Sequence, residues 1–162
     1  MIEELQREHL LELSNCLRAP SVYEYISELP TVENFVLDRE IALRGPSSEA
    51  SGEVWLNFLV RELASSNMIG RLEATLHNSI AEVAFLFNPE YWGNGFASES
   101  LDWLHKNIQR SHGISEYWAA TAPENFRCQA LLTRAGYRKV DSGFPPLYSY
   151  DAGDMVFNFS AR

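Results

Sequence analysis

The spacing of hydrophobic residues predicts helices at the start of the chain and strands after them. Leu10, Leu13 and Leu17 recur at intervals typical of one face of an α-helix, and a looser helical pattern continues to about residue 45. Three later segments have the residue pattern that is typical of β-strands: residues 53–61, 68–77 and 80–87. Polar residues at 77–79 predict a hairpin turn, so we expect an antiparallel meander.

Beyond residue 88 the pattern changes to a helical period. Two amphipathic helices are predicted from apolar residues on one face: Ala97, Leu101, Leu104 and Ile108, then Cys128, Leu131, Leu132 and Ala135. Further strands are predicted at residues 116–121, 137–140 and 154–160. This order predicts a mixed α/β fold with a mostly antiparallel central sheet and helices on both faces. We expect one domain over residues 1–162.

Composition narrows the class of protein. With 162 residues, 46% of them hydrophobic and 22% charged, the chain is close to the globular average, which excludes disordered and coiled-coil proteins. No apolar run approaches the ~20 residues that span a bilayer. The acidic start lacks the features of a signal peptide. Cys16 and Cys128 are too few for a disulfide framework or a cysteine-based zinc site. We expect a cytoplasmic protein that binds no metal and no membrane.

The net charge of −9 argues against a nucleic-acid partner, which would require many lysines and arginines. The charge is uneven. Residues 106–139 hold six basic residues against two acidic ones, a net charge of +4, so the rest of the chain carries −13. This basic island suggests either a local anion site or a set of solvated helix positions, and the sequence leaves both open.

The segment between the strand at 80–87 and the next helix contains two glycines, Gly93 and Gly95. Glycines two apart let the backbone turn tightly, and the helix that follows adds free N–H groups. Such a junction can hold a pyrophosphate, although ordinary loops have the same composition. The motif of a triphosphate-binding loop is absent, and a dinucleotide fingerprint would need glycine at Ser98.

Two segments resemble the GNAT superfamily of N-acetyltransferases. Residues 81–100 (AEVAFLFNPEYWGNGFASES) are similar to its acetyl-CoA-binding core. Residues 125–137 (NFRCQALLTRAGY) resemble the corresponding segment of the branch that acetylates ribosomal-protein N-termini. The resemblance covers residues 69–140. It implies a GNAT-like fold, with acetyl-CoA as the acyl donor and CoA as the product.

The resemblance also implies which residues hold acetyl-CoA: Phe85, Leu86, Phe87, Trp92, Gly93, Asn94, Gly95, Phe96, Ala97, Ser98, Asn125, Arg127 and Cys128. Arg127 and Arg134 would flank the phosphates. An acceptor amine would attack the thioester directly, with the oxyanion stabilised by a backbone N–H of the strand at 80–87. From the residues alone, Asn125 is a helix cap.

Catalysis requires that the amine lose a proton, because alkyl amines have pKa values near 10. Glu82 is the first candidate for the base, and the alternative is a solvated strand residue. Glu53, Glu73 and His77 are weaker candidates. Cys128 would donate a proton to the departing thiolate, or would only pack in the interior.

Three positions depart from the family pattern. The family begins with a short strand that carries basic residues, which Met1 to Leu10 does not resemble, so we expect that strand to be missing or degenerate. Glu90 stands where the wider superfamily often has Arg or Gln. Leu132 stands where many members have a tyrosine acid, so that role is vacant or filled elsewhere.

The acceptor is expected to be a primary amine: a protein N-terminus, a polyamine or another small cationic amine. The charge of −13 outside the basic island suggests a cleft for a cation between the N-terminal helices and the loop at 141–153. The residues expected to bind the amine are Tyr23, Glu24 and Tyr148, with Glu28, Asp151 and Asp154 as further carboxylates and Tyr25 and Tyr150 as further aromatic walls. The alternative is that the acidity only maintains solubility.

Two other functions remain open. A non-catalytic acyl-CoA-binding sensor on the same fold would keep the cofactor site and release no thiol. A dinucleotide-binding protein would bind NAD in place of CoA. The sequence also leaves open whether the chain forms a homodimer.

Overall fold

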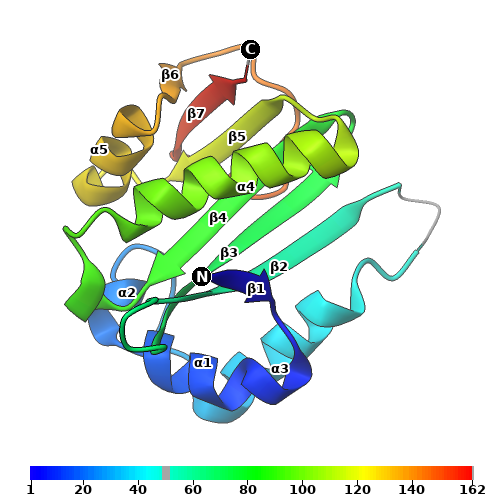
Figure 1. The fold of residues 1–162 in the computed structure, drawn as a ribbon. Coiled ribbons are helices and arrows are strands. Elements are labelled where there is room, and N and C mark those ends of the chain that lie inside the picture. The colour runs from blue at the N-terminus through cyan, green and yellow to red at the C-terminus, as the bar shows by residue number, and fades with distance from the viewer. Residues whose placement is uncertain (49–51, 162) are drawn as a thin grey trace.

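The computed structural model describes residues 1–48 and 52–161. Within them, seven strands form one sheet in the order β1-β2-β3-β4-β5-β7-β6 (Figure 1). The strands are β1 (Ile2–Glu4), β2 (Val54–Arg61), β3 (Met68–His77), β4 (Ile80–Phe87), β5 (Glu116–Thr121), β6 (Arg138–Val140) and β7 (Met155–Ser160). Among the strand pairs in these residues, only β4 and β5 run parallel. The predicted mixed, mostly antiparallel sheet is confirmed.

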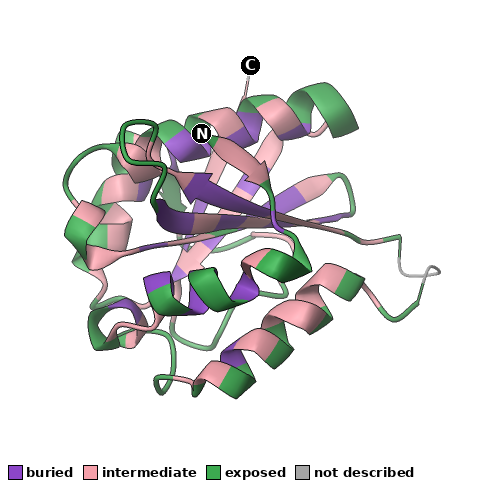
Figure 2. Ribbon diagram, turned by 60° about the horizontal axis from the view of Figure 1, so that its bottom comes forward, coloured by how far each residue is buried: buried purple, intermediate pink, exposed green. Residues whose placement is uncertain are grey.

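Helices cover both faces of the sheet. They are α1 (Leu10–Leu17), α2 (Pro20–Tyr23), α3 (Val32–Arg44), α4 (Phe96–His112) and α5 (Phe126–Arg134), with short 3-10 turns η1 (Arg7–His9) and η3 (Pro89–Tyr91). Helix α4 lies over one face, and α1 and α3 lie against the other (Figures 1 and 2). In the described part of the chain, no helix has the length and apolarity needed to cross a membrane.

Two hydrophobic clusters hold these layers together, one on each side of the sheet. Leu101, Leu104 and Ile108 of α4 are fully buried with side chains of β3, β4 and β5. On the other side, Leu13 and Leu17 of α1 are fully buried in a second cluster. The helical faces predicted from apolar spacing are therefore the buried faces, as helix amphipathicity requires.

The N-terminal strand, expected to be missing or degenerate, is present as β1, so it is not missing, but it has only three residues and none of them is basic. Ile2 lies opposite Val60 in an antiparallel pairing with β2. The Arg61 N–H donates to the Met1 carbonyl at 2.8 Å, and the Arg61 guanidinium pairs with Glu3 at 2.8 Å. Backbone pairing and an ion pair hold this three-residue edge strand, so it needs no hydrophobic alternation that a sequence pattern could reveal.

Strands β4 and β5 separate soon after they meet. Their pairing includes only Ala81 with Tyr117 and Glu82 with Trp118, whereas β4 continues to Phe87. Beyond Glu82, the edge of β4 that faces β5 therefore pairs with no other strand in the described residues. Unpaired backbone N–H and C=O groups along such an edge are ready to bind an extended ligand that carries amides.

Candidate functional site

The turn before α4 forms a cradle of backbone N–H groups. Gly93 and Gly95 have φ values of 79° and 85°, the left-handed region that glycine adopts most easily. Gly95 is the N-cap of α4, a helix of 17 residues whose first N–H groups have no intrahelical partner. A cavity of about 330 Å³ opens here, and a Cβ added to either glycine would meet no atom within 4 Å. The cradle fits a pyrophosphate.

Basic and aromatic side chains form the wall of this cradle. The Trp92 indole N–H donates to the Phe87 carbonyl at 2.8 Å, which fixes the ring. The Arg127 guanidinium lies over that ring, with Cζ 3.7 Å from its centre, and Arg134 lines the same cavity. A guanidinium stacked in this way is held in place to meet a phosphate.

The residues of the basic island therefore fall into two groups, those that line the cavity and those on the surface. Arg127 and Arg134 line the cavity, as the anion-site interpretation predicts. Lys106 instead pairs with Asp102 at 2.6 Å on the exposed face of α4, and Lys139 pairs with Asp141 at 2.7 Å. For these two lysines the alternative of solvated surface positions is correct.

Three cavities follow one another along β4. The cavity at the glycines shares Phe87, Trp92 and Arg127 with a second cavity of about 120 Å³. That second cavity shares Phe85, Leu86, Asn125 and Cys128 with a third, the largest, of about 400 Å³. The series runs from the cradle to the gap between β4 and β5, which suits one long ligand.

Of the residues predicted to hold acetyl-CoA, all but one line this series of cavities: Phe85, Leu86, Phe87, Trp92, Gly93, Gly95, Phe96, Ala97, Ser98, Asn125, Arg127 and Cys128. The exception is Asn94, whose amide donates to the carbonyls of Tyr91 and Trp92 and so ties the turn together. Asn125 is also the predicted helix cap, because its side chain accepts the Cys128 N–H at 3.1 Å.

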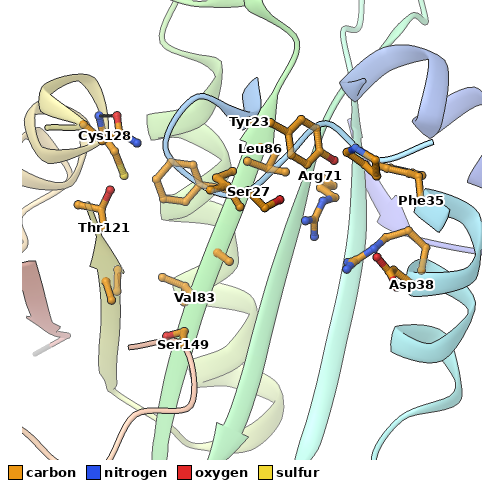
Figure 3. A pocket seen from close by; sticks show the side chains of 18 residues that line it. Tyr23, Ser27, Phe35, Asp38, Arg71, Val83, Leu86, Thr121, Cys128 and Ser149 are labelled. Atoms are coloured by element: carbon orange, nitrogen blue, oxygen red, sulfur yellow. Dashed lines mark hydrogen bonds between the residues drawn. The ribbon is translucent and has the colours of Figure 1, made fainter. Parts of the chain in front are cut away.

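Cys128 lies where β4 and β5 separate. It lines both the second and the largest cavity and faces Thr121 on β5 (Figure 3). Burial raises the pKa of the Cys128 thiol, and the Thr121 hydroxyl offsets part of that increase. The thiol therefore stays protonated at neutral pH and can donate a hydrogen bond or a proton.

Glu82 is buried and anchors the loop that precedes β7. Its Oε1 lies 2.6 Å from His77 Nε2 and accepts the Tyr148 N–H at 2.7 Å. Its Oε2 accepts the N–H of Ser149 at 2.9 Å and the Ser149 hydroxyl. Burial alone would raise the pKa of Glu82, but these hydrogen bonds outweigh it and lower the pKa below the ordinary value. Because the residue is only 4% exposed, the alternative of a solvated strand residue is wrong.

The weaker candidates for the base are engaged as well. Glu73 contacts the guanidinium groups of both Arg39 and Arg71. Glu53 accepts the indole N–H of Trp55 at 3.0 Å. The catalytic roles of Glu82 and of these residues stay predictions.

The family assignment follows from comparison with known proteins. The profile of the family described as "Acetyltransferase (GNAT) domain" matches residues 1–138. The chain belongs to the GNAT acetyltransferases. The resemblance found in the sequence is thereby confirmed, and the free edge of β4 is part of a fold that this family uses for acetyl transfer.

Solved structures agree with this GNAT fold. A domain from Methanocaldococcus jannaschii matches with a TM-score of 0.75 at 18% identity, over 99% of this chain and 97% of that one. A PaiA N-acetyltransferase from Thermoplasma acidophilum, in complex with coenzyme A, matches with a TM-score of 0.70 at 19% identity, over 99% and 98%. A Vibrio cholerae protein, provisionally described as a ribosomal-protein-serine acetyltransferase, gives 0.72 at 18%, over 99% and 92%. No curated protein sequence matches the chain.

Two departures from the GNAT pattern have a clear place in the structure. Leu132, at the position of the usual tyrosine, is fully buried in the core and lines none of the cavities described above. Glu90 is exposed and also lies outside them. The family's usual tyrosine acid is therefore replaced by a packing residue.

The predicted acceptor cleft has the expected walls but different charges. Tyr23 of α2 and Ser149 of the loop at 141–153 line the largest cavity, and Tyr148 lines an adjacent cavity of about 270 Å³. None of the predicted carboxylates lines either cavity: Glu24, Glu28, Asp151 and Asp154. The largest cavity is lined by Arg39 and Arg71, together with Asp38, whereas the adjacent cavity is lined by the carboxylates Glu73 and Glu82.

Sequence reasoning missed these two arginines. Arg71 could have been found from the alternation of residues 68–77, which places it on the same face of the strand as Glu73. Arg39 carries no comparable signal, because its role depends on where α3 packs against the sheet.

Proposed function

We propose that the protein is an N-acetyltransferase that moves an acetyl group from acetyl-CoA to a primary amine. The observation that carries this proposal is the series of three cavities that follows the free edge of β4 from the glycine cradle to Cys128. The family assignment supports it, as does coenzyme A bound to the Thermoplasma acidophilum relative.

The residues present fit acetyl-CoA. The N–H groups at residues 95–98, with Arg127 and Arg134, would hold the pyrophosphate and the neighbouring phosphate. The N–H and C=O groups of Phe85 and the N–H of Phe87 face the free edge and would pair with the amides of pantetheine, in the way that an added strand pairs with a sheet edge. The backbone groups of Leu86 face β3 instead, as the N–H of Asn88 does, so Leu86 lines the cavity without pairing through its backbone.

When bound, acetyl-CoA supplies the acetyl group: an N–C bond forms as the C–S bond breaks, and the acceptor ammonium loses two protons, one of which ends on the CoA thiol. The chain contributes mainly position, by holding the amine against the edge of β4. A backbone N–H of β4 would stabilise the oxyanion. The protonated Cys128 thiol would donate its proton to the departing sulfur and regain one from the nitrogen that has been acetylated.

Glu82 has a different part in this proposal. Its carboxylate oxygens are engaged by His77, Tyr148 and Ser149, so it holds the loop that closes the acceptor side. The second ammonium proton then passes to water in the cavity.

A non-catalytic acyl-CoA sensor is the second candidate, favoured by the buried Leu132 at the position of the family's usual acid. The two functions differ in turnover. We expect calorimetry to show binding of acetyl-CoA and none of NAD, and free thiol to appear when amines are added. The amine panel should contain amino acids, peptides with varied N-termini, polyamines and aminoglycosides. Binding without thiol release from any amine would support the sensor, and binding of NAD alone would contradict both.

A further inference from the structure

The sheet face below α3 is polar where a core would be apolar. Register places Arg71 opposite Leu86, Glu73 opposite Ala84 and Thr75 opposite Glu82. In antiparallel strands, directly opposed residues share a face, and so do residues two apart. Three polar residues of β3 and the Glu82 carboxylate thus line one face. Ala84 is the small residue in the middle, and it borders both the largest cavity and the adjacent cavity.

Arg71 is enclosed there without a full set of partners. Its side chain is 12% exposed, and its Nε has no hydrogen-bond partner. Its Nη1 contacts the Glu73 carboxylate as an ion pair without the alignment of a hydrogen bond. Arg39 Nη1 contacts the same carboxylate, so two guanidinium groups share one negative charge.

The remaining neighbours of Arg71 do not fully neutralise its charge. Asp38 also lines the cavity, and its charge offsets part of the effect of burial on the pKa of Arg39, but Asp38 itself is exposed, so water screens part of its charge. The Tyr23 side chain points toward Arg71 (Figure 3). Burial, together with the charge of Arg39, lowers the pKa of Arg71 to about 9. At neutral pH it remains charged, and a buried, underpaired cation is costly unless a ligand completes it.

We propose that the acceptor amine carries a carboxylate, and that Arg71 and Arg39 bind this carboxylate while the amine meets the edge of β4. This inference rests on the proposed acetyl transfer and adds the class of acceptor. The Arg guanidinium presents parallel N–H groups that match a carboxylate. A polyamine would bring a second positive charge toward two arginines. The acceptor is therefore an amino acid or a peptide with an acidic N-terminal residue, and not the purely cationic amine suggested by the charge of the chain.

Matched acceptors test this directly. The rate constant kcat/KM is measured for an amino acid and its carboxamide, and for a peptide that begins with Asp and its counterpart with Asn. We expect the wild type to prefer the carboxylate in at least one of the two sets by about tenfold or more. The set with the larger preference identifies the source as a free amino acid or a peptide. In Arg71→Gln, and in Arg39→Gln should the first variant not fold, the preference should fall below about threefold.

Arg7→Gln is the matched control, because Arg7 pairs with Glu40 of α3 in a surface ion pair with its side chain 83% exposed. It should keep the wild-type preference. A preference for carboxamides, polyamines or phosphate-bearing amines would overturn the inference, as would a preference that survives in both cavity variants.

A binding measurement separates this inference from the proposed function. N-acetylated amino acids and N-acetylated acidic peptides cannot react further, and one of these sets should raise the Tm of the wild type but not that of Arg71→Gln. If thiol is released from amines but neither set protects the wild type, the inference fails and the acetyltransferase stands. If one set protects but no amine releases thiol, the proposed function fails and the carboxylate site stands.

Discussion

The cradle before α4 and the cavity below α3 are both suited to anions, but they are built differently. The cradle uses backbone N–H groups from one short segment, residues 93–98. The cavity uses the side chains of Arg39 and Arg71, which come from α3 and β3 and meet only in the folded chain. Backbone donors carry no net charge, so the cradle needs no counter-ion, whereas the two guanidinium groups need Glu73 between them.

The two halves of the site are therefore controlled in different ways. The donor half depends on local backbone geometry, so a change of one glycine should disturb it without altering the acceptor half. The acceptor half depends on tertiary contacts, including the anchoring of residues 148 and 149 by Glu82.

The largest effect is expected where the halves meet, at Cys128. Replacing it with alanine removes the proton donor and should lower kcat by about 100-fold, whereas Cys128→Ser keeps a donor and should stay within about tenfold of the wild type. Calorimetry should show that both variants bind acetyl-CoA normally. If both variants keep wild-type kcat, Cys128 only packs, and the acid lies elsewhere.

The next largest effect is expected at Glu82, which anchors the acceptor half of the site. In Glu82→Gln, the amide places an NH2 group against donors of Tyr148 and Ser149. Denaturant unfolding should show a loss of about 2 kcal/mol, because hydrogen bonds to a charged group are worth about 1.5–3 kcal/mol. The KM for the acceptor should rise, while the Kd for acetyl-CoA stays unchanged. A Glu82→Gln protein with normal stability and acceptor KM, but a kcat lowered by 100-fold or more, would instead identify Glu82 as the base.

A smaller effect is expected at the glycine cradle, which belongs to the donor half of the site. Gly95→Val places a Cβ where pyrophosphate must approach, and the Kd for acetyl-CoA in calorimetry should rise at least ~tenfold, about 1.4 kcal/mol. Gly113 is the control, since it caps the other end of α4 with φ 68° and equally open surroundings. Gly113→Val carries the same backbone strain and should bind acetyl-CoA as the wild type does. Equal losses in both variants would mean that helix stability, and not the cradle, governs binding.

The smallest effect concerns pH and the core beneath α4. His105 is buried beside Tyr137, and burial lowers its pKa from 6.5 to about 4. Because the pKa of His105 is lower in the folded than in the unfolded chain, its contribution to the free energy of unfolding is fully present well above pH 6.5. That contribution is lost as the pH falls toward 4. From pH 7 to pH 6 the loss should be about 0.7 kcal/mol. This part of the slope should disappear in His105→Gln, and a slope equal to that of the wild type would contradict the assignment.

Much of the fold could be predicted because its signals are local. The strands expected at 68–77, 80–87 and 116–121 match β3, β4 and β5 residue for residue. Each is long enough for alternation to be visible. The three-residue β1 was missed because its contacts are with the distant Val60 and Arg61.

The candidate site was likewise predictable only where its signals are local. The glycine cradle and the Asn125 cap are set by neighbouring residues, so sequence spacing predicts them. Two of the partners of Glu82, Tyr148 and Ser149, lie 66 and 67 residues away, in a loop with no periodic pattern. Arg39 and Glu73 are separated by 34 residues and by a strand. Net charge predicted an acidic acceptor side, but the charges that face the cavity are set by packing and not by composition.

A site divided at β4 into a donor half and an acceptor half is tested most directly by initial rates of thiol release in two variants, Gly95→Ala and Arg71→Gln. With the acceptor whose carboxylate the wild type prefers, Gly95→Ala should raise the KM for acetyl-CoA alone. Arg71→Gln should raise the KM for the acceptor alone. A wild type that releases no thiol with any amine, or an Arg71→Gln variant whose KM rises for acetyl-CoA and not for the acceptor, would contradict this division of the site.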